Sequence, residues 1–271
     1  MTAVEWFLLS CLIAAGPVLL WSRARRTLRE TSLAMPFPAE WRSLLEEKLP
    51  LYRRMPLDVR VKLEPVVRRF LTDERIVGCQ GLVVTEEMRL LISVQACLLI
   101  VMRNPETYDS LRAVLLYPDE FVVNESEEDE DGVVHEGESV LTGQSINDTE
   151  IVLSWKDVQA SSTEGDIYNV VLHEFAHYLD NSVDGTLTDT ASGRDELATW
   201  HELIEREYDA LCAAVDRGEP TLIDPYGTES TAEFFAVATE TFFEAPVELK
   251  RMHPELYKDL ATFYGLDPAA W

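Results

Sequence analysis

Basic residues are scarce in this sequence, where 23 lysines and arginines stand against 49 aspartates and glutamates. The formal net charge at pH 7 is −26, and a surface of that sign repels the phosphate backbone of DNA and RNA. The composition therefore argues against nucleic acid as a partner. It agrees with high solubility or with a salt-rich cytoplasm, and the charge alone does not choose between them.

Cysteines are few and widely scattered. They form no C-x-x-C pair, and they are Cys11, Cys79, Cys97 and Cys212. Zinc sites and redox centres built from cysteine use closely spaced pairs, so we expect neither. Reduced thiols that serve as small hydrophobic side chains are the simpler interpretation.

Long hydrophobic runs are also missing, because no uncharged stretch reaches the roughly 20 residues that span a bilayer core. The nearest, WFLLSCLIAAGPVLLW, extends from Trp6 to Trp21 and precedes an arginine cluster in residues 23–26. Interfacial tryptophans and the basic residues behind the run predict an outside N-terminus and a cytoplasmic chain. We therefore expect residues 1–35 to form an apolar helix that anchors the chain at the inner (plasma) membrane, followed by a linker. A cleaved signal peptide lacks support without a basic segment before the run, and a buried helix in a soluble cytoplasmic protein is the alternative.

Residues 36–271 are numerous enough to bury a sizeable core, and we expect them to form one α+β domain. Helical spacing of apolar residues predicts helices at 39–48, 57–72 with an interruption at Pro65, 85–102, 195–216, 231–243 and 247–265. Short β-rich runs predict strand, turn and strand over 113–123, and further strands at 133–134, 139–142 and 149–155.

The stretch HEFAH at 173–177 carries the clearest chemistry in the chain. A helix over 167–180, with Asp166 as its N-cap, places His173 and His177 one turn apart on the same face. Two imidazoles at that spacing can bind one metal ion from a single rigid element. The spacing therefore predicts two zinc ligands.

Glu174 lies next to the first of these ligands, where it can act as general base on a metal-activated water. Apolar neighbours predict that the helix is buried, and buried imidazoles need partners. This favours a metal site over a surface helix that carries two histidines by chance. The predicted strand 149–155 comes just before this helix, a place where a strand in metallopeptidases can pair with an extended peptide.

A catalytic zinc ion usually has three protein ligands. The metzincin form of the third ligand is missing, because Val183 stands at its histidine position and Asp180 at its glycine position. Two acids farther on remain, Glu196 in a polar setting and Glu233 at the start of an apolar helix. An acid among phenylalanines is costly unless it is paired or binds a cation, which favours Glu233.

Two further residues have alternative roles. Tyr226 follows a turn, where its phenol either donates a hydrogen bond to an oxyanion near the metal or packs as an ordinary turn residue. Asp180 either orients a ligand imidazole or caps the end of the helix. We expect the turn that follows the helix to end at Asp184-Gly185, before a polar loop over 186–194.

The acidic run NESEEDEDG at 124–132 has some features of a calcium loop. Glu127, Asp129 and Asp131 precede Gly132, and Glu138 falls where such a loop has its last ligand. The first position of such a loop would nevertheless be Glu127 in place of Asp, and strands rather than helices are expected beside it. We expect a solvated loop, and a membrane-tethered adaptor that recruits a basic partner through it is one rival function.

Several stretches together resemble the zinc-dependent peptidases typified by Mlc titration factor A. The matching stretches are QGLVV (80–84), VLLYPDEFVV (114–123), TGQS (142–145), IVLSW (151–155), HEFAHYLD (173–180), YGTESTAEFFAV (226–237) and ETFFEAP (240–246). The metal region is also similar to the catalytic domain of anthrax lethal factor. The resemblance implies a zincin-like α+β metalloprotease domain with a small mixed sheet, and one zinc ion on His173, His177 and Glu233.

The resemblance further implies that Glu174 is the base, that Tyr226 assists the transition state, and that peptides are hydrolysed with aminopeptidase character. The family's type member is a cytoplasmic protein that binds a glucose-responsive transcriptional repressor, so a transcriptional regulator is an implied partner. This chain departs from it in its N-terminal apolar segment and its acidity. A binding protein that contains zinc and sequesters a regulator without catalysis is the other rival.

Overall fold

A computed structural model describes residues 35–73, 75–104, 106–119, 121–128, 134–141, 143–147, 149–161, 165, 167–187 and 191–271. Within these ranges, the side chains of 121–147 and 181–199 are not described. The predicted anchor segment 1–35 therefore lies outside the described residues except for Met35, and so does the predicted cap Asp166. Among the described helices, none is both long and apolar enough to cross a membrane.

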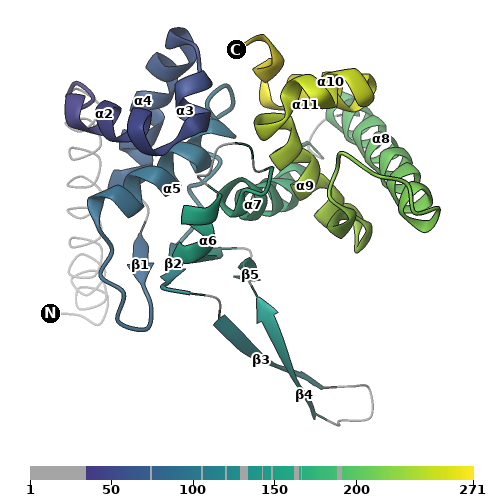
Figure 1. Cartoon of the computed structure of the whole chain (residues 1–271), viewed down its shortest axis with the longest axis horizontal. Helices are drawn as coiled ribbons and strands as arrows, with labels where there is room; N and C mark the ends of the chain where they lie inside the picture. Colours follow the sequence, from purple (N-terminus) through teal and green to yellow (C-terminus); the bar gives the residue numbers. More distant parts are fainter. Residues whose placement is uncertain are drawn as a thin grey trace, which may run out of the picture.

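Four helices from the first part of the described chain lie together on one side of the domain (Figure 1). They are α2 (Ala39–Lys48), α3 (Pro50–Arg54), α4 (Leu57–Asp73) and α5 (Glu86–Leu98). The predicted interruption of α4 at Pro65 is wrong. A proline leaves the carbonyl four residues earlier without its helical partner, and Val61 is 57% exposed, so water can hydrate that carbonyl.

Helix α5 is the core helix that its apolar sequence predicts. It begins at Thr85, whose hydroxyl accepts a hydrogen bond from the backbone N–H of Met88 at 3.2 Å. From Leu90 to Leu98 every residue is buried. The helix ends at Leu98 rather than at 102, and turns continue the chain through Arg103.

A four-stranded mixed sheet has the order β1-β2-β6-β5. Its strands are β1 (Ile76–Gly78), β2 (Ala113–Tyr117), β6 (Glu150–Ser154) and β5 (Gly143–Asn147). The first three are parallel, whereas β5 runs antiparallel to β6. The expected small mixed sheet of an α+β domain is thus confirmed. Strand β6, predicted as 149–155, has a partner on each side, so β5 rather than β6 is the last strand of the sheet.

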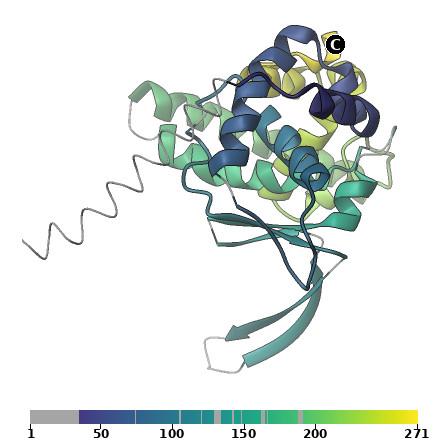
Figure 2. The same ribbon diagram turned by 90° about the vertical axis from the view of Figure 1, so that its left-hand side faces the viewer.

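A separate hairpin of β3 (Phe121–Glu128) and β4 (Val134–Leu141) projects away from the helices (Figures 1 and 2). Part of the predicted acidic loop, residues 124–128, therefore belongs to a strand, and 129–132 lie outside the described residues. The register explains how a strand tolerates these acids. Glu125 lies opposite Gly137 and Glu127 opposite His135, so like charges do not face each other directly.

The second half of the chain is helical around the remaining core. Its elements are α6 (Trp155–Ala160), α7 (Val170–Leu187), α8 (Ala191–Asp216), η1 (Pro225–Thr228), α9 (Thr231–Glu244), α10 (Pro246–Met252), α11 (Pro254–Tyr264) and η2 (Pro268–Ala270). The predicted helix end at 180 and the turn at Asp184-Gly185 are wrong, because α7 continues to Leu187. The predicted loop 186–194 is wrong at 186–187 and 191–194, which are helical, and its residues 188–190 lie outside the described residues. A glycine inside a helix costs only about 1 kcal/mol, which the rest of a long helix offsets.

Helix α7 lies at the centre of the domain (Figure 1). It contacts α5, α6, α8 and α9, and strands β5 and β6 of the sheet. Its Phe175 is fully buried, with ring centroids 5.3 Å from Tyr108 and 6.0 Å from Phe70. Helix α9 is buried from Phe234 to Phe243. Burial of one such phenylalanine stabilises the fold by about 1.5–3 kcal/mol, so these two helices form a rigid pair.

Candidate metal centre

The start of α7 is set by Asn169, which directly precedes its first residue, Val170. The side-chain oxygen of Asn169 accepts a hydrogen bond from the backbone N–H of Leu172 at 3.1 Å, as an N-cap residue does. Its backbone carbonyl accepts from the N–H of His173 at 2.9 Å. The helix thus begins at Val170 rather than at the expected residue 167, and Asn169 lies one turn before His173.

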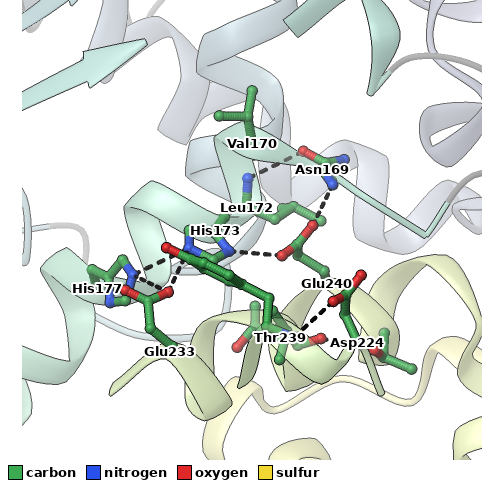
Figure 3. A network of polar contacts seen from close by, with 12 residues as sticks. Asn169, Val170, Leu172, His173, His177, Asp224, Glu233, Thr239 and Glu240 are labelled. Atoms are coloured by element: carbon green, nitrogen blue, oxygen red, sulfur yellow. Dashed lines mark hydrogen bonds and ion pairs between the residues drawn. The ribbon is translucent and has the colours of Figure 1, made fainter. Parts of the chain in front are cut away.

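His173, His177 and Glu233 are brought together by the packing of α7 against α9 (Figure 3). The Nε2 atoms of the two imidazoles are 3.2 Å apart. The Oε2 atom of Glu233 lies 3.1 Å from Nε2 of His173 and 3.3 Å from Nε2 of His177. Three donor atoms from two rigid helices therefore converge on one point.

The triangle formed by these donor atoms fits a zinc ion. Tetrahedral zinc with bonds of about 2.1 Å holds neighbouring ligand atoms about 3.4 Å apart, close to the separations within the cluster. The Nδ1 atom of His173 lies 2.7 Å from Oε1 of Glu240. A neutral imidazole that donates this Nδ1–H presents a lone pair at Nε2. The donor set is thus suited to a cation.

Glu240 is a residue of the candidate site that the sequence analysis missed. It is only 3% exposed, and it also accepts a hydrogen bond from the backbone N–H of Asn169. The available signal was its spacing, because residues 233, 240 and 244 fall on one face of α9. That face can be recognised as functional only once α9 is known to lie beside α7.

The pKa values of residues in the cluster are strongly shifted from their ordinary values. Burial alone would lower the pKa of His173, but its hydrogen bonds to Glu233 and Glu240 outweigh burial and raise that pKa to about 10. Burial opposes the charge on Glu233, yet hydrogen bonds from both imidazoles lower its pKa to about 2. In the metal-free protein a proton on His173 therefore supplies part of the positive charge that a metal ion would bring.

Glu174 is 4% exposed and lies beside the cluster in sequence. Burial raises the pKa of its carboxyl to about 7, against the opposing influence of His173 and His177. A carboxyl with a pKa near neutrality can both accept and release a proton at pH 7. This property is expected of a general base that later serves as an acid.

Tyr226 lies at the edge of the cluster, on η1. Its ring centroid is 6.1 Å from that of His173, and the side chain is 47% exposed. The Asp224 carboxylate accepts from the Tyr226 backbone N–H at 2.8 Å and so caps the turn. Burial of its ring, with the nearby Glu233 carboxylate, raises the pKa of Tyr226 to about 12. The phenol therefore stays protonated and able to donate a hydrogen bond.

The family model of the glucose-regulated metallo-peptidases M90 matches residues 20–265. This chain belongs to that family. Mlc titration factor A of Serratia proteamaculans is 35% identical to it over 237 residues, covering 86% of this chain and 88% of that protein. Mlc titration factor A of Pectobacterium atrosepticum is 34% identical over 226 residues, covering 82% and 84%. An uncharacterised protein of Synechocystis is 36% identical over 237 residues, covering 86% of each.

Membership of the M90 family confirms the resemblance drawn from the sequence motifs, and it establishes a metallopeptidase-type protein. The matched region contains the whole cluster of His173, His177 and Glu233. It begins at residue 20, behind most of the N-terminal apolar run.

Two other residues considered as site residues have different surroundings. Glu196, the alternative third ligand, belongs to α8, and its side chain lies outside the described residues. Burial raises the pKa of Tyr264 on α11, and the charge of the Asp180 carboxylate adds to that rise. The Nδ1 atom of the His173 imidazole contacts the carboxylate of Glu240.

Proposed function

We propose that this M90 metallopeptidase hydrolyses peptide bonds with one zinc ion bound by His173, His177 and Glu233, and with Glu174 as general base. The observation that carries the proposal is the convergence of three donor atoms within 3.3 Å of one another beside a buried carboxyl. When bound, zinc supplies a Lewis acid that polarises a carbonyl and makes water more acidic.

The residues of the chain move the proton. Glu174 takes a proton from the attacking water and then passes it to the departing amine, which its pKa of about 7 allows. Its burial keeps bulk water from competing for that proton. Tyr226 donates a hydrogen bond to the oxygen that becomes negative when the peptide carbonyl is attacked.

Strand β5 is the proposed docking edge for the substrate backbone. It is the last strand of the sheet, pairs antiparallel with β6, and contacts α7. An extended peptide added there would run past the metal helix with its backbone hydrogen-bonded. Aminopeptidase character, implied by the family resemblance, is part of the proposal and requires the free amino end to stop at the metal site.

A regulatory role is the second candidate, and the names of the curated relatives favour it. Two relatives are called Mlc titration factor A, a name that describes titration of a protein called Mlc. This chain would by analogy bind a transcriptional regulator, either as a peptidase or as a non-catalytic zinc protein that sequesters it. Sequestration would be favoured by two results together: a variant without the metal-binding side chains no longer binds the regulator, and wild type hydrolyses no peptide.

The proposed location is the cytoplasmic side of the inner membrane, with residues 1–35 as a single-pass anchor. The apolar run and the arginines behind it support this proposal. Recovery of the full chain in the membrane fraction, and of a chain without residues 1–35 in the soluble fraction, is expected. Recovery of both in the soluble fraction would favour the soluble cytoplasmic alternative.

The peptidase proposal is tested by metal analysis combined with cleavage of a peptide library. Wild type is expected to carry one zinc ion per chain, to cleave peptides, and to lose activity to a chelator. Matched peptides with free and acetylated amino ends decide the mode, because an aminopeptidase cleaves only the free series. Stoichiometric zinc without cleavage of either series would contradict the enzymatic proposal.

A further inference from the structure

Polar contacts that the proposed reaction does not use hold the start of the metal helix. The side-chain nitrogen of Asn169 donates to Oε1 of Glu244 at 2.9 Å and to Oε1 of Gln95 at 2.8 Å. These acceptors lie on α9 and α5, two helices that both contact α7. Together with its cap to Leu172, they leave Asn169 with one possible orientation.

Glu244 is itself held from a third helix. The Arg54 guanidinium, on α3, donates to Oε2 of Glu244. It also donates to the backbone carbonyls of Phe243 and Glu244, each at 3.1 Å. These carbonyls belong to the last turn of α9, where a cation is favourably placed. Arg54 therefore fixes both the end of α9 and the carboxylate that binds Asn169.

A second carboxylate, that of Glu240, contacts both Asn169 and the proposed metal ligand His173. Glu240 accepts from the backbone N–H of Asn169 with one oxygen and contacts Nδ1 of His173 with the other, at 2.7 Å. Its two oxygens thus span one turn of α7 (Figure 3). A displacement of Asn169 would move the carboxylate that orients the imidazole.

We propose that Arg54, Glu244 and Asn169 form a positioning network that holds His173 in a metal-binding orientation. The network acts through Glu240, and none of its three members is a proposed ligand. The inference rests on the proposed zinc site and adds to it the residues that preorganise it. Buried carboxylates cost free energy of solvation, and apolar side chains could fill the same volume without that cost. Orientation of a ligand gives these polar groups a role.

The test is the zinc dissociation constant, measured by competition with a chromophoric chelator and independent of peptidase activity. Glu244→Ala and Arg54→Met are expected to weaken zinc binding by about tenfold, the lower end of the roughly 10- to 100-fold effects of outer-sphere partners. Glu248→Ala, at an exposed acid on α10, is the matched control and should leave the constant unchanged.

A conservative rescue separates orientation from general stability. Glu244→Gln keeps an oxygen that can accept from the Asn169 amide, so its zinc affinity should return to within about threefold of wild type. Cobalt-substituted Glu244→Ala should also show an altered visible absorption spectrum, since the geometry at His173 changes. A purely structural network would instead lower the melting temperature with zinc affinity and cobalt spectrum unchanged.

The outcomes distinguish this inference from the proposed function. Wild type that takes up no zinc or cobalt would overturn both. Tight binding by wild type together with unchanged affinity in folded Glu244→Ala and Arg54→Met would overturn the inference alone. If Glu244→Ala does not fold, Arg54→Met decides, because the Arg54 side chain is 38% exposed and methionine keeps its aliphatic packing.

Discussion

His173 contacts Glu240 through Nδ1 at 2.7 Å while its Nε2 faces the proposed metal position. Helix α9 supplies a carboxylate to each side of this imidazole, Glu233 on one nitrogen and Glu240 on the other. The ring is thereby fixed in orientation before a metal ion binds, and the contact at Nδ1 sets the tautomer of the neutral ring that would bind the metal. Preorganisation of this kind makes the geometry of the site depend on residues that do not bind the metal.

Glu240→Ala is expected to weaken zinc binding by about 10- to 100-fold. The reason is the loss of the acceptor for Nδ1–H, which leaves the ring free to rotate and its other nitrogen less basic. Isothermal titration against a chelator measures the change. Zinc affinity equal to that of wild type would show that Glu240 does not orient the ligand.

The stabilisation that zinc gives should grow with pH between about 6.5 and 9. The pKa of His173 rises on folding from 6.5 to about 10, so its protonation stabilises the metal-free fold fully below 6.5 and progressively less as pH approaches 10. Zinc binds only the neutral ring, so the stability of the zinc-bound protein does not depend on protonation of His173. Melting temperatures with zinc and with chelator measure the difference, and metal-free stability that stays level over this range would contradict the assignment.

The metal-free protein should lose stability in strong acid, where Glu233 becomes protonated. Folding lowers the pKa of Glu233 from 4.5 to about 2, so its charge stabilises the fold above 4.5 and this contribution disappears as pH falls through 2. The free energy of unfolding of Glu233→Gln is therefore expected to fall less steeply than that of wild type as the pH decreases in the acid range. Urea unfolding of the metal-free protein at several pH values measures the slope, and an identical slope in both proteins would argue against it.

Tyr226→Phe is expected to lower kcat by about 10²-fold while KM and zinc content change little. The variant removes one hydrogen-bond donor to the developing oxyanion, a loss of this size in other hydrolases, and keeps the ring. Steady-state kinetics on a peptide substrate measure it. An unchanged kcat would return Tyr226 to the alternative role of an ordinary turn residue.

Gly227→Ala should disturb the turn that carries Tyr226. A Cβ atom there would lie 2.7 Å from Cγ2 of Val237 and 3.3 Å from the backbone of Phe234, so η1 must move away from α9. Overpacking of this kind costs about 1–3 kcal/mol. We expect a lower melting temperature and a lower kcat with zinc retained, and wild-type kcat in a destabilised variant would show that the turn does not position the phenol.

The parts of the site that sequence could predict are those that depend on one helix. The spacing of His173 and His177 follows from the geometry of α7. The cost of burying Glu233 among the phenylalanines of α9 favoured it as the third ligand. Glu240, Asn169 and Arg54 could not be found this way, because their roles arise only where α3, α7 and α9 meet. Local spacing does not reveal which helices pack together.

For the fold as well, the sequence predicted some features correctly and others wrongly. The amphipathic helices, the core helix α5 and several strands follow from periodicity, the family resemblance implied the mixed sheet, and the α+β class is confirmed. The errors lie where a single residue or a charge run was given too much weight. Pro65 and Gly185 lie inside continuous helices, since the remaining helical contacts offset their cost. Glu125 and Glu127 lie in a strand, opposite Gly137 and His135, so they do not face another acid directly.

Replacement of Glu174 by glutamine tests the central claim most directly, because the amide keeps the shape of the side chain but cannot accept the proton. Zinc content and peptide turnover are measured on the same purified Glu174→Gln protein. The account predicts zinc at the wild-type level and turnover reduced by about 10²- to 10⁴-fold. Turnover near that of wild type, in a variant that still holds its zinc, would contradict it.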